Sequence, residues 1–328
     1  GFAREQAEIE RFRAANYRVA EHKRWIIRKV SLFAPLISFI SHVNLFILLA
    51  YGGYLVICYE RAPDALTARL IEQAGFPAVY MTGFGATATL IGCPDVGLLT
   101  QTEMTTHARN IVRAVDLPVI ADADTGYGGP ANIERTVREY QQAGVAAIHL
   151  EDQAAPKRCG HMAGIKLVPV DEMLRRLECA LAARGDDDLV IIGRTDALAA
   201  SGLDEALDRA RRYRQAGVDI VFVDAVKRVA DAHAIGQAIE GPLMISVVEG
   251  HETTALKPDE LKRMGFSLAL YPLSTLFTAA RAIQEVLAEL NEQGTTHAQA
   301  DRMMSYADFS AVVRLDHFRG LDDRFGHG

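Results

Sequence analysis

The sequence predicts an α/β fold, a (β/α)8 barrel of the TIM type preceded by an N-terminal hydrophobic helical segment. From about residue 60, short continuous apolar runs alternate with segments of helical period, as expected for parallel strands covered on both faces. Four helical segments end in a glycine that is followed by a bulky apolar residue and the next strand-like run. An open doubly wound sheet is the alternative, disfavoured because no glycine-rich phosphate loop follows the first strand-like run.

The N-terminal part differs in character from the rest of the chain. Residues 1–29 contain eight basic and four acidic side chains, whereas 30–59 contain no Asp, Glu, Lys or Arg. Such a run exceeds the roughly 20 residues that span a bilayer as a helix, so we predict membrane contact through 30–59. A buried hairpin or helix is the alternative. We place a domain boundary between 1–57, which is also interpreted as a fusion artefact, and a catalytic barrel over 58–328.

The barrel elements are expected in the following order. The first strand lies at 54–59, and the others lie at 78–83, 117–124, 146–152, 188–197, 219–225, 242–250 and 267–272. Pro169 is expected to open a helix that Gly185 closes. Ser201 and Asp204 have the spacing of a capping box at the start of the next helix.

Acidic side chains stand where the predicted strands end. The charged residues at these ends are Asp122, Asp124, Glu151, Asp152, Arg194, Asp196, Asp224 and Glu249. The carboxyl ends of barrel strands converge on one face, so these carboxylates would repel one another without a cation. Oxygen ligands favour Mg²⁺, with Mn²⁺ as the alternative. The alternative for any one of these carboxylates is a structural role, as the N-cap of a helix or as a partner in a salt bridge at the end of a strand.

A loop with three cations and a thiol follows the strand at 146–152. It reads Lys157-Arg158-Cys159-Gly160-His161. Neighbouring cations lower the pKa of a thiol, which would make Cys159 an acid or a base. A zinc site is disfavoured because no second pair of ligands has suitable spacing. The remaining histidines, His107, His149, His233 and His251, are interpreted as structural.

Composition narrows the function classes. The chain has 328 residues, 49% of them hydrophobic, and a net charge of −7, which argues against a nucleic-acid partner. Four cysteines do not make a disulfide framework in a chain of this length. They suit a reducing compartment, so a cytoplasmic location is predicted, with association with a membrane through 30–59 as the alternative.

Residues 62–328 resemble the isocitrate lyase and phosphoenolpyruvate mutase superfamily, and most closely its methylisocitrate lyase-like and dimethylmalate lyase-like members. The matching strings are YMTGFG (80–85), PDVG (94–97), DADTGYGG (122–129), EDQ (151–153), PKRCGH (156–161), GRTDA (193–197) and LALYPLS (268–274). The resemblance implies a Mg²⁺-dependent barrel enzyme that acts on a small 2-hydroxy or 2-oxo carboxylate. It also implies a homotetramer that exchanges a C-terminal helix, for which 300–325 is the candidate. Residues 1–57 resemble a transmembrane part of an ABC exporter.

The same resemblance implies roles for individual side chains. The metal would be held by Asp122, Asp124 and Glu151, with support from Asp95. Cys159 would be the acid or base, with Tyr80 as its partner, and Arg194 would bind a substrate carboxylate. The other substrate-binding residues would be Thr82, Gly83, Phe84, Lys157, Arg158, Gly160, His161 and Ser246. Asp224 replaces the Glu usual in this branch, and Ser246 replaces a common Asn.

The activity that these roles imply is cleavage of a carbon–carbon bond. A 2-hydroxy di- or tricarboxylate of the 2-methylisocitrate or 2,3-dimethylmalate type would undergo retro-aldol cleavage to a 2-oxo acid and a carboxylate. One alternative is decarboxylation or hydrolysis of oxaloacetate, or phosphonate chemistry in the same barrel. The other is an inactive chain tethered to a membrane.

Overall fold

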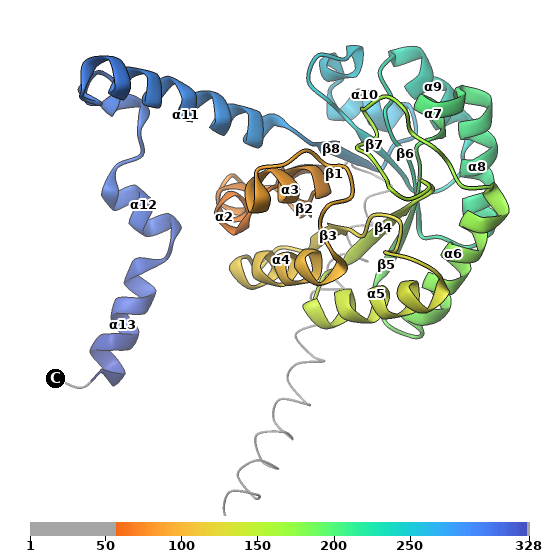
Figure 1. The fold of residues 1–328 in the computed structure, drawn as a ribbon, viewed down its shortest axis with the longest axis horizontal. Coiled ribbons are helices and arrows are strands. Elements are labelled where there is room, and N and C mark those ends of the chain that lie inside the picture. Colours follow the sequence, from red (N-terminus) through yellow and green to blue (C-terminus); the bar gives the residue numbers. More distant parts are fainter. Residues whose placement is uncertain (1–56, 327–328) are drawn as a thin grey trace, which may run out of the picture. The chain divides into compact units, whose positions relative to one another are not determined.

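The computed structural model describes residues 57–326, in which eight parallel strands alternate with helices and close into a barrel (Figure 1). The strands are β1 (Ile57–Ala62), β2 (Val79–Met81), β3 (Val119–Asp122), β4 (Ala147–Glu151), β5 (Val190–Thr195), β6 (Ile220–Val223), β7 (Leu243–Ser246) and β8 (Leu268–Tyr271). Each strand pairs with its neighbours in sequence, and β1 pairs with β8. The predicted barrel is therefore confirmed, and the open sheet is excluded.

Helices follow the strands along the chain. They are α2 (Ala65–Gln73), α3 (Gly83–Ile91), α4 (Gln101–Ala114), α5 (Pro130–Ala143), α6 (Val170–Arg184), α7 (Ala197–Ser201), α8 (Leu203–Gln215), α9 (Val229–Ala238), α10 (Pro258–Arg263), α11 (Ser274–Gln293), α12 (Tyr306–Val312) and α13 (Leu315–Phe325), with short 3₁₀ turns at Glu252–Ala255 and His297–Arg302. The helices α2 to α10 surround the strands, as a barrel sequence requires (Figure 1).

The structure describes only the last residues of the uncharged N-terminal run, from Ile57 onward. Residues 1–56 lie outside the described part, so the hydrophobic helical segment, its likeness to an exporter and its membrane contact stay predictions. Among residues 57–326, no helix has the length and apolar character to cross a membrane. The first strand lies at 57–62 rather than 54–59, because its pairing with β2 runs from Glu60 to Ala62.

Two predictions about helices are corrected. Pro169 caps α6 and Gly185 ends it, as expected. Ser201, however, ends α7, and α8 starts after Gly202, whose φ of 93° suits glycine, so the predicted capping box does not form. Residues 300–325 form two helices, α12 and α13, rather than one, with Arg314 between them in the left-handed region.

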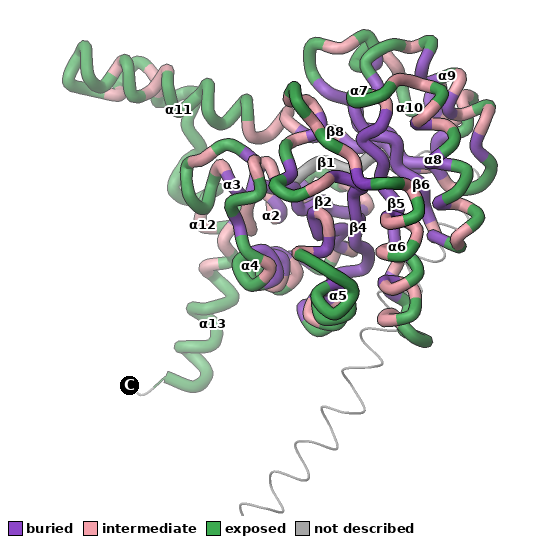
Figure 2. Tube along the Cα trace, turned by 45° about the vertical axis from the view of Figure 1, so that its right-hand side comes forward, coloured by how far each residue is buried: buried purple, intermediate pink, exposed green. Residues whose placement is uncertain are grey.

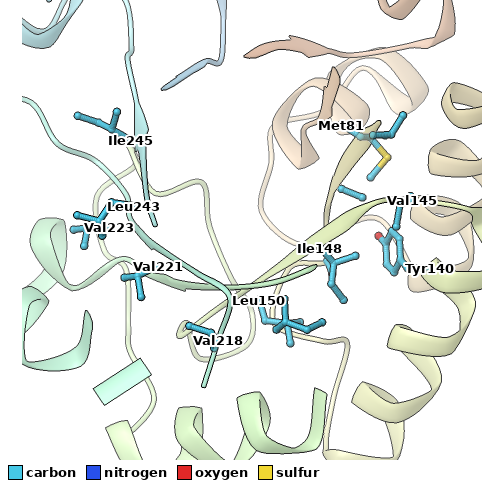
Figure 3. Close-up of a cluster of buried hydrophobic side chains, with 14 of the residues drawn as sticks. Met81, Tyr140, Val145, Ile148, Leu150, Val218, Val221, Val223, Leu243 and Ile245 are labelled. Carbon is cyan, nitrogen blue, oxygen red and sulfur yellow. The ribbon is translucent and has the colours of Figure 1, made fainter. Parts of the chain in front are cut away.

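Apolar side chains on the outer face of the strands pack against the helices and form the main core. Met81, Ile148, Leu150 and Val221 belong to this layer, and each is at most 1% exposed (Figure 3). Figure 2 shows burial concentrated on the strands and exposure on the outer surfaces of the helices. Removal of this apolar area from water is the main stabilising contribution to the fold.

A second, smaller apolar cluster fills the inside of the barrel. Its members include Tyr80, Ile120, Ala147, Ile192 and Phe222. Because successive side chains on a strand point to opposite faces, the residue two positions further along also faces inward. The inward positions above this cluster are occupied by Asp122, His149, Glu151, Arg194, Asp224 and Ser246. Alternation along the strands thus gathers polar groups at the carboxyl end of the barrel.

Candidate active site

A small, partly open cavity lies at the carboxyl ends of the strands. It is lined by Thr82, Phe84, Asp95, Asp122, Glu151, Lys157, Arg158, Cys159, Gly160, His161, Arg194 and Asp224. Its volume of about 10 Å³ corresponds to roughly one water molecule. This space is smaller than a dicarboxylate, so we expect the 154–166 loop to move when such a ligand binds.

Asp122, at the end of β3, is held by two backbone donors and by a histidine. Its Oδ2 accepts the Gly83 N–H at 2.9 Å, and its Oδ1 accepts the Asp124 N–H at 3.0 Å. His149 lies opposite it on β4, with Nε2 at 3.2 Å from Oδ1. Burial alone would raise the pKa of Asp122, but His149 and the nearby cations hold that pKa well below its usual range. A Cβ at Gly83 would lie 2.6 Å from Asp122 Oδ2, so only glycine fits there.

Arg194 on β5 is surrounded by carboxylates. It lies opposite Glu151 in the strand register, 3.4 Å from it. Its Nη2 donates to Asp196 and to Asp224, each at 2.8 Å. The guanidinium also lies over the ring of Phe222. Arg194 is 5% exposed, and these charge-assisted contacts fix the direction of its guanidinium.

Lys157 occupies the other side of the cavity. Its Nζ contacts Asp95 at 2.7 Å and also forms an ion pair with Asp124. Burial alone would lower the pKa of Lys157, but the surrounding carboxylates raise it well above its usual value. Burial raises the pKa of Asp124 to about 6 in spite of the lysine. Lys157 is therefore the counter-ion of this acidic group.

The donor set fits a divalent cation. One ligand atom each from Asp122, His149 and Glu151 lies within 4.8 Å of the others, and all three residues are buried. Glu151 Oε1 has no hydrogen-bond partner among the described residues, and burial raises the pKa of this carboxyl well above its usual range. A buried carboxyl oxygen without a donor is stabilised either by protonation or by a bound cation, so Glu151 Oε1 is available as a metal ligand. The carboxylate oxygen atoms suit Mg²⁺ or Mn²⁺.

The pKa of the Cys159 thiol differs from the sequence-based expectation. Burial raises the pKa of its thiol to about 11, so the predicted lowering by neighbouring cations is wrong. The reason is the direction of the neighbouring side chains. Lys157 turns to its carboxylates, and Arg158 donates to the Ala163 carbonyl oxygen. At neutral pH the thiol keeps its proton, which suits a proton donor rather than a nucleophile.

Gly160 and His161 bring the loop against the far wall of the cavity. A Cβ at Gly160 would lie 2.6 Å from Asp196 Oδ1 and 2.7 Å from Arg194 Nη2, so the backbone approaches as only glycine allows. His161 Nε2 lies 3.7 Å from Asp224 Oδ1. The Cys159 N–H donates to the Asp95 carbonyl oxygen at 3.0 Å. These contacts hold the tip of the loop over Arg194.

Other predicted site residues lie behind the cavity wall. Tyr80, one layer deeper, is fully buried and stacks on His149 at 5.7 Å. Ser246 is buried at the end of β7. Glu249 is exposed and accepts a hydrogen bond from Ser274, so its expected membership in the carboxylate group is wrong. The strand ends at Ser246, three residues before Glu249.

Sequence reasoning missed the place of His149, which is not merely structural because it lies in the polar cluster. The signal that could have found it is its position two residues before Glu151 on the same strand. Asp152 was grouped with the site, but it points outward. It accepts hydrogen bonds from Thr195, the Asp196 N–H, Arg209 and Tyr213.

Comparison with known proteins places the chain in a family. A model of the family described as phosphoenolpyruvate phosphomutase matches residues 53–291. The chain belongs to this family. It is a carbon–carbon lyase of the isocitrate lyase and phosphoenolpyruvate mutase superfamily. The match begins inside the uncharged N-terminal run, at residue 53.

Three relatives of this lyase are informative. It is 42% identical over 267 residues to 2,3-dimethylmalate lyase of Eubacterium barkeri, covering 81% of this chain and 92% of the relative. It is 42% identical over 266 residues to probable 2-methylisocitrate lyase 1 of Corynebacterium glutamicum, covering 80% and 87%. A solved structure of oxaloacetate acetylhydrolase in complex with 3,3-difluorooxalacetate is 34% identical, with a TM-score of 0.82, and covers 88% of this chain and 98% of the other.

Proposed function

We propose that this lyase cleaves the C2–C3 bond of a small 2-hydroxy di- or tricarboxylate of the 2,3-dimethylmalate or 2-methylisocitrate type. The observation that carries the proposal is the convergence of Asp122, Glu151, Arg194 and Cys159 on one cavity. The first two supply anionic ligands, the third a carboxylate-binding fork and the last a protonated thiol. Relatives named for these two substrates support the choice of substrate class.

We assign the metal to the carboxylates at the ends of β3 and β4. Asp122 and Glu151 would hold Mg²⁺ or Mn²⁺, with Asp124 and Asp95 next to them, and His149 would orient Asp122 or ligate directly. When bound, the ion supplies electrostatic stabilisation for negative charge that develops on the substrate oxygens. Thr82, Gly83 and Phe84, at the start of α3, would bind the 2-oxo acid part of the product.

The chain's own groups divide the remaining work. Arg194 binds and orients a substrate carboxylate. Asp224, which faces the cavity beside His161, accepts the proton of the 2-hydroxyl group. The electron pair of the breaking C2–C3 bond passes to the departing fragment, and the thiol of Cys159 donates its proton to that carbon. Lys157, Arg158, Gly160 and His161 close the loop over the substrate and exclude water.

Replacement of Cys159 by Ser tests this assignment. A hydroxyl group is a far weaker acid than even a thiol with a raised pKa. We expect cleavage of 2,3-dimethylmalate and 2-methylisocitrate to fall by about 10²–10⁴-fold in kcat, the usual contribution of a general acid. Unchanged turnover in a coupled assay for the 2-oxo acid product would remove Cys159 from the chemistry.

Hydrolysis or decarboxylation of oxaloacetate is the second candidate function. The likeness to oxaloacetate acetylhydrolase favours it, since the two folds agree over most of both chains. Phosphonate chemistry remains a third option within the family. A panel of 2-oxo and 2-hydroxy acids with Mg²⁺ separates them. Turnover of oxaloacetate without cleavage of either hydroxy acid would overturn the lyase assignment of substrate.

A cytoplasmic location and a tethered, inactive chain are the opposed proposals for the N-terminal part. Cell fractionation with an assay of each fraction distinguishes them. We expect the activity in the fraction without membranes. Protein found only with membranes, and silent on every acid tested, would favour the inactive chain.

A further inference from the structure

Gln153 connects the barrel to the loop that covers the cavity. It follows Glu151 and Asp152 at the end of β4, and only 1% of its surface is exposed. The two ends of the loop are joined beside it. The Ala154 N–H donates to the Lys166 carbonyl oxygen at 2.7 Å, and Gln153 forms an isolated antiparallel bridge with Leu167. The base of the loop is thus fixed, and Gln153 lies where base and tip meet.

Both ends of the Gln153 amide are used on the same loop residue. Its Oε1 accepts the Arg158 N–H at 2.9 Å, and its Nε2 donates to the Arg158 carbonyl oxygen at 2.7 Å. This two-point contact fixes the peptide groups on both sides of Arg158, the second of which immediately precedes Cys159. Rotation of the Arg158 backbone away from this position would leave the buried Gln153 Oε1 without its donor, which costs free energy.

The same amide also reaches the residue that holds Arg194. Gln153 Nε2 donates to Asp196 Oδ2 at 2.9 Å, while Asp196 Oδ1 accepts from Arg194 Nη2 at 2.8 Å. A continuous path of hydrogen bonds therefore joins the backbone before Cys159 to the guanidinium in the cavity. Gln153 itself does not line the cavity.

We propose that Gln153 is a positioning residue that holds the loop closed over the site. Through Asp196 it also couples the position of Cys159 to the orientation of Arg194. This inference rests on the proposed function for the role of Cys159, but the latch itself can be tested without activity. The other contacts of the loop tip, made by Lys157, by His161 and by the Cys159 N–H, go to groups at the cavity. Gln153 is therefore the point at which closure can be weakened without removal of a substrate or metal contact.

The test is the Gln153→Met variant, which keeps the length of the side chain and removes both ends of the amide. The rate at which iodoacetamide modifies Cys159 is measured by peptide mass spectrometry, with Cys93 followed in the same sample. Because the closed loop covers most of Cys159 and opening of the loop exposes it further, we expect Cys159 to react about tenfold faster or more in the variant. The rate at Cys93 should not change.

Gln141→Met is the matched control. Gln141 also donates from its Nε2 to a carbonyl oxygen, that of Arg184 at 3.1 Å, but it lies at the end of α5, away from the loop. We expect this variant to show the wild-type rate at Cys159. If Gln153→Met does not fold, Gln153→Glu replaces it. The glutamate keeps an acceptor for the Arg158 N–H but sets a carboxylate against Asp196.

Steady-state kinetics give the second measurement. Since Gln153 touches no substrate, we expect kcat to fall about tenfold or more while KM changes much less. An unchanged rate of modification at Cys159 would overturn the proposal, even if kcat fell. Faster modification in a protein whose wild type cleaves none of the acids would support the latch and overturn the proposed function instead.

Discussion

The neighbourhood of Asp122 and His149 shows how the barrel uses one strand pair for two purposes. Below them, Tyr80 and Phe222 contact the His149 ring. Above them, the carboxylate faces the cavity. An imidazole held between aromatic rings and a carboxylate has one direction only, so it fixes the carboxylate as well.

A prediction for His149 follows from this arrangement. Replacement by Asn removes the nitrogen next to Asp122 Oδ1, and we expect the affinity for Mg²⁺ to fall by about 10–100-fold, as is usual for groups that orient ligands. Titration calorimetry measures the change. His107→Asn is the control, because His107 contacts the Pro63 carbonyl oxygen instead. Equal affinities of all three proteins for Mg²⁺ would contradict this role.

The raised pKa of Cys159 predicts a pH dependence. The thiolate is the form that reacts with iodoacetamide, and with a pKa of about 11 its fraction at pH 8 is small. As pH rises toward 11, the thiolate fraction grows, so the rate of modification at Cys159 should continue to increase across this range. Peptide mass spectrometry at several pH values measures it. A rate that levels off by pH 8 would show a lowered pKa.

The residues also show what the sequence could reveal about the site. Asp122, Glu151 and Arg194 were predicted because strand-end charges in a barrel meet on one face. His149 was missed because an isolated histidine has no motif, and only the alternation of strand residues places it. The pKa direction at Cys159 was wrong because the directions of Lys157 and Arg158 depend on tertiary ion pairs that neighbours in sequence do not reveal.

At the scale of elements, Asp152 joins β4, β5 and α8. Its carboxylate is fully buried and accepts from Thr195, Arg209 and Tyr213. It also accepts the Asp196 N–H, which fixes the turn that carries Asp196 under the loop. The elements that position the cavity are therefore held together from the outer side of the barrel.

Loss of this buried charge should destabilise the whole barrel. We expect Asp152→Asn to lower the free energy of unfolding by about 3–5 kcal/mol, because Arg209 loses its buried partner. Asp204→Asn, at an exposed position on α8, should change it by less than about 0.5 kcal/mol. Urea unfolding followed by circular dichroism measures both. Coincident unfolding curves for the two variants would contradict the expected role.

Most elements were predictable because each strand is an apolar run and several helices end in a glycine just before the next strand. The glycine after α5, Gly144, adopts the left-handed conformation that its position predicted. The start of α8 was not predictable from Ser201 and Asp204. Gly202, with a φ of 93°, stands at the N-cap position of α8, so Ser201 is not placed to cap this helix.

At the scale of the whole molecule, the C-terminal helices expose apolar side chains. None of the residues of α11 or α13 is buried, and Ile283 and Leu287 are 58% and 57% exposed. Apolar side chains repeated along one helix favour association with another surface. This supports the proposed homotetramer with exchange of C-terminal helices, which stays a prediction.

Substitution on α11 tests the association. We expect Ile283→Asp combined with Leu287→Asp to dissociate the tetramer, because charged groups would enter a surface that is apolar in the assembly. Sedimentation velocity measures the mass. Gln284→Asp, at an exposed position on the same helix, is the control and should leave the mass unchanged. A wild type that sediments as a monomer would refute the assembly.

The tight cavity under the loop has a consequence for anyone who designs inhibitors. A compound that competes for Arg194 must wait for an opening event before it meets its target. As the inhibitor concentration rises, the rate at which inhibition develops should therefore approach a maximum, which is the rate of loop opening. Potencies measured after short incubations would then reflect how often the loop opens rather than the affinity of each compound. Compounds that bind tightly but slowly would be discarded wrongly.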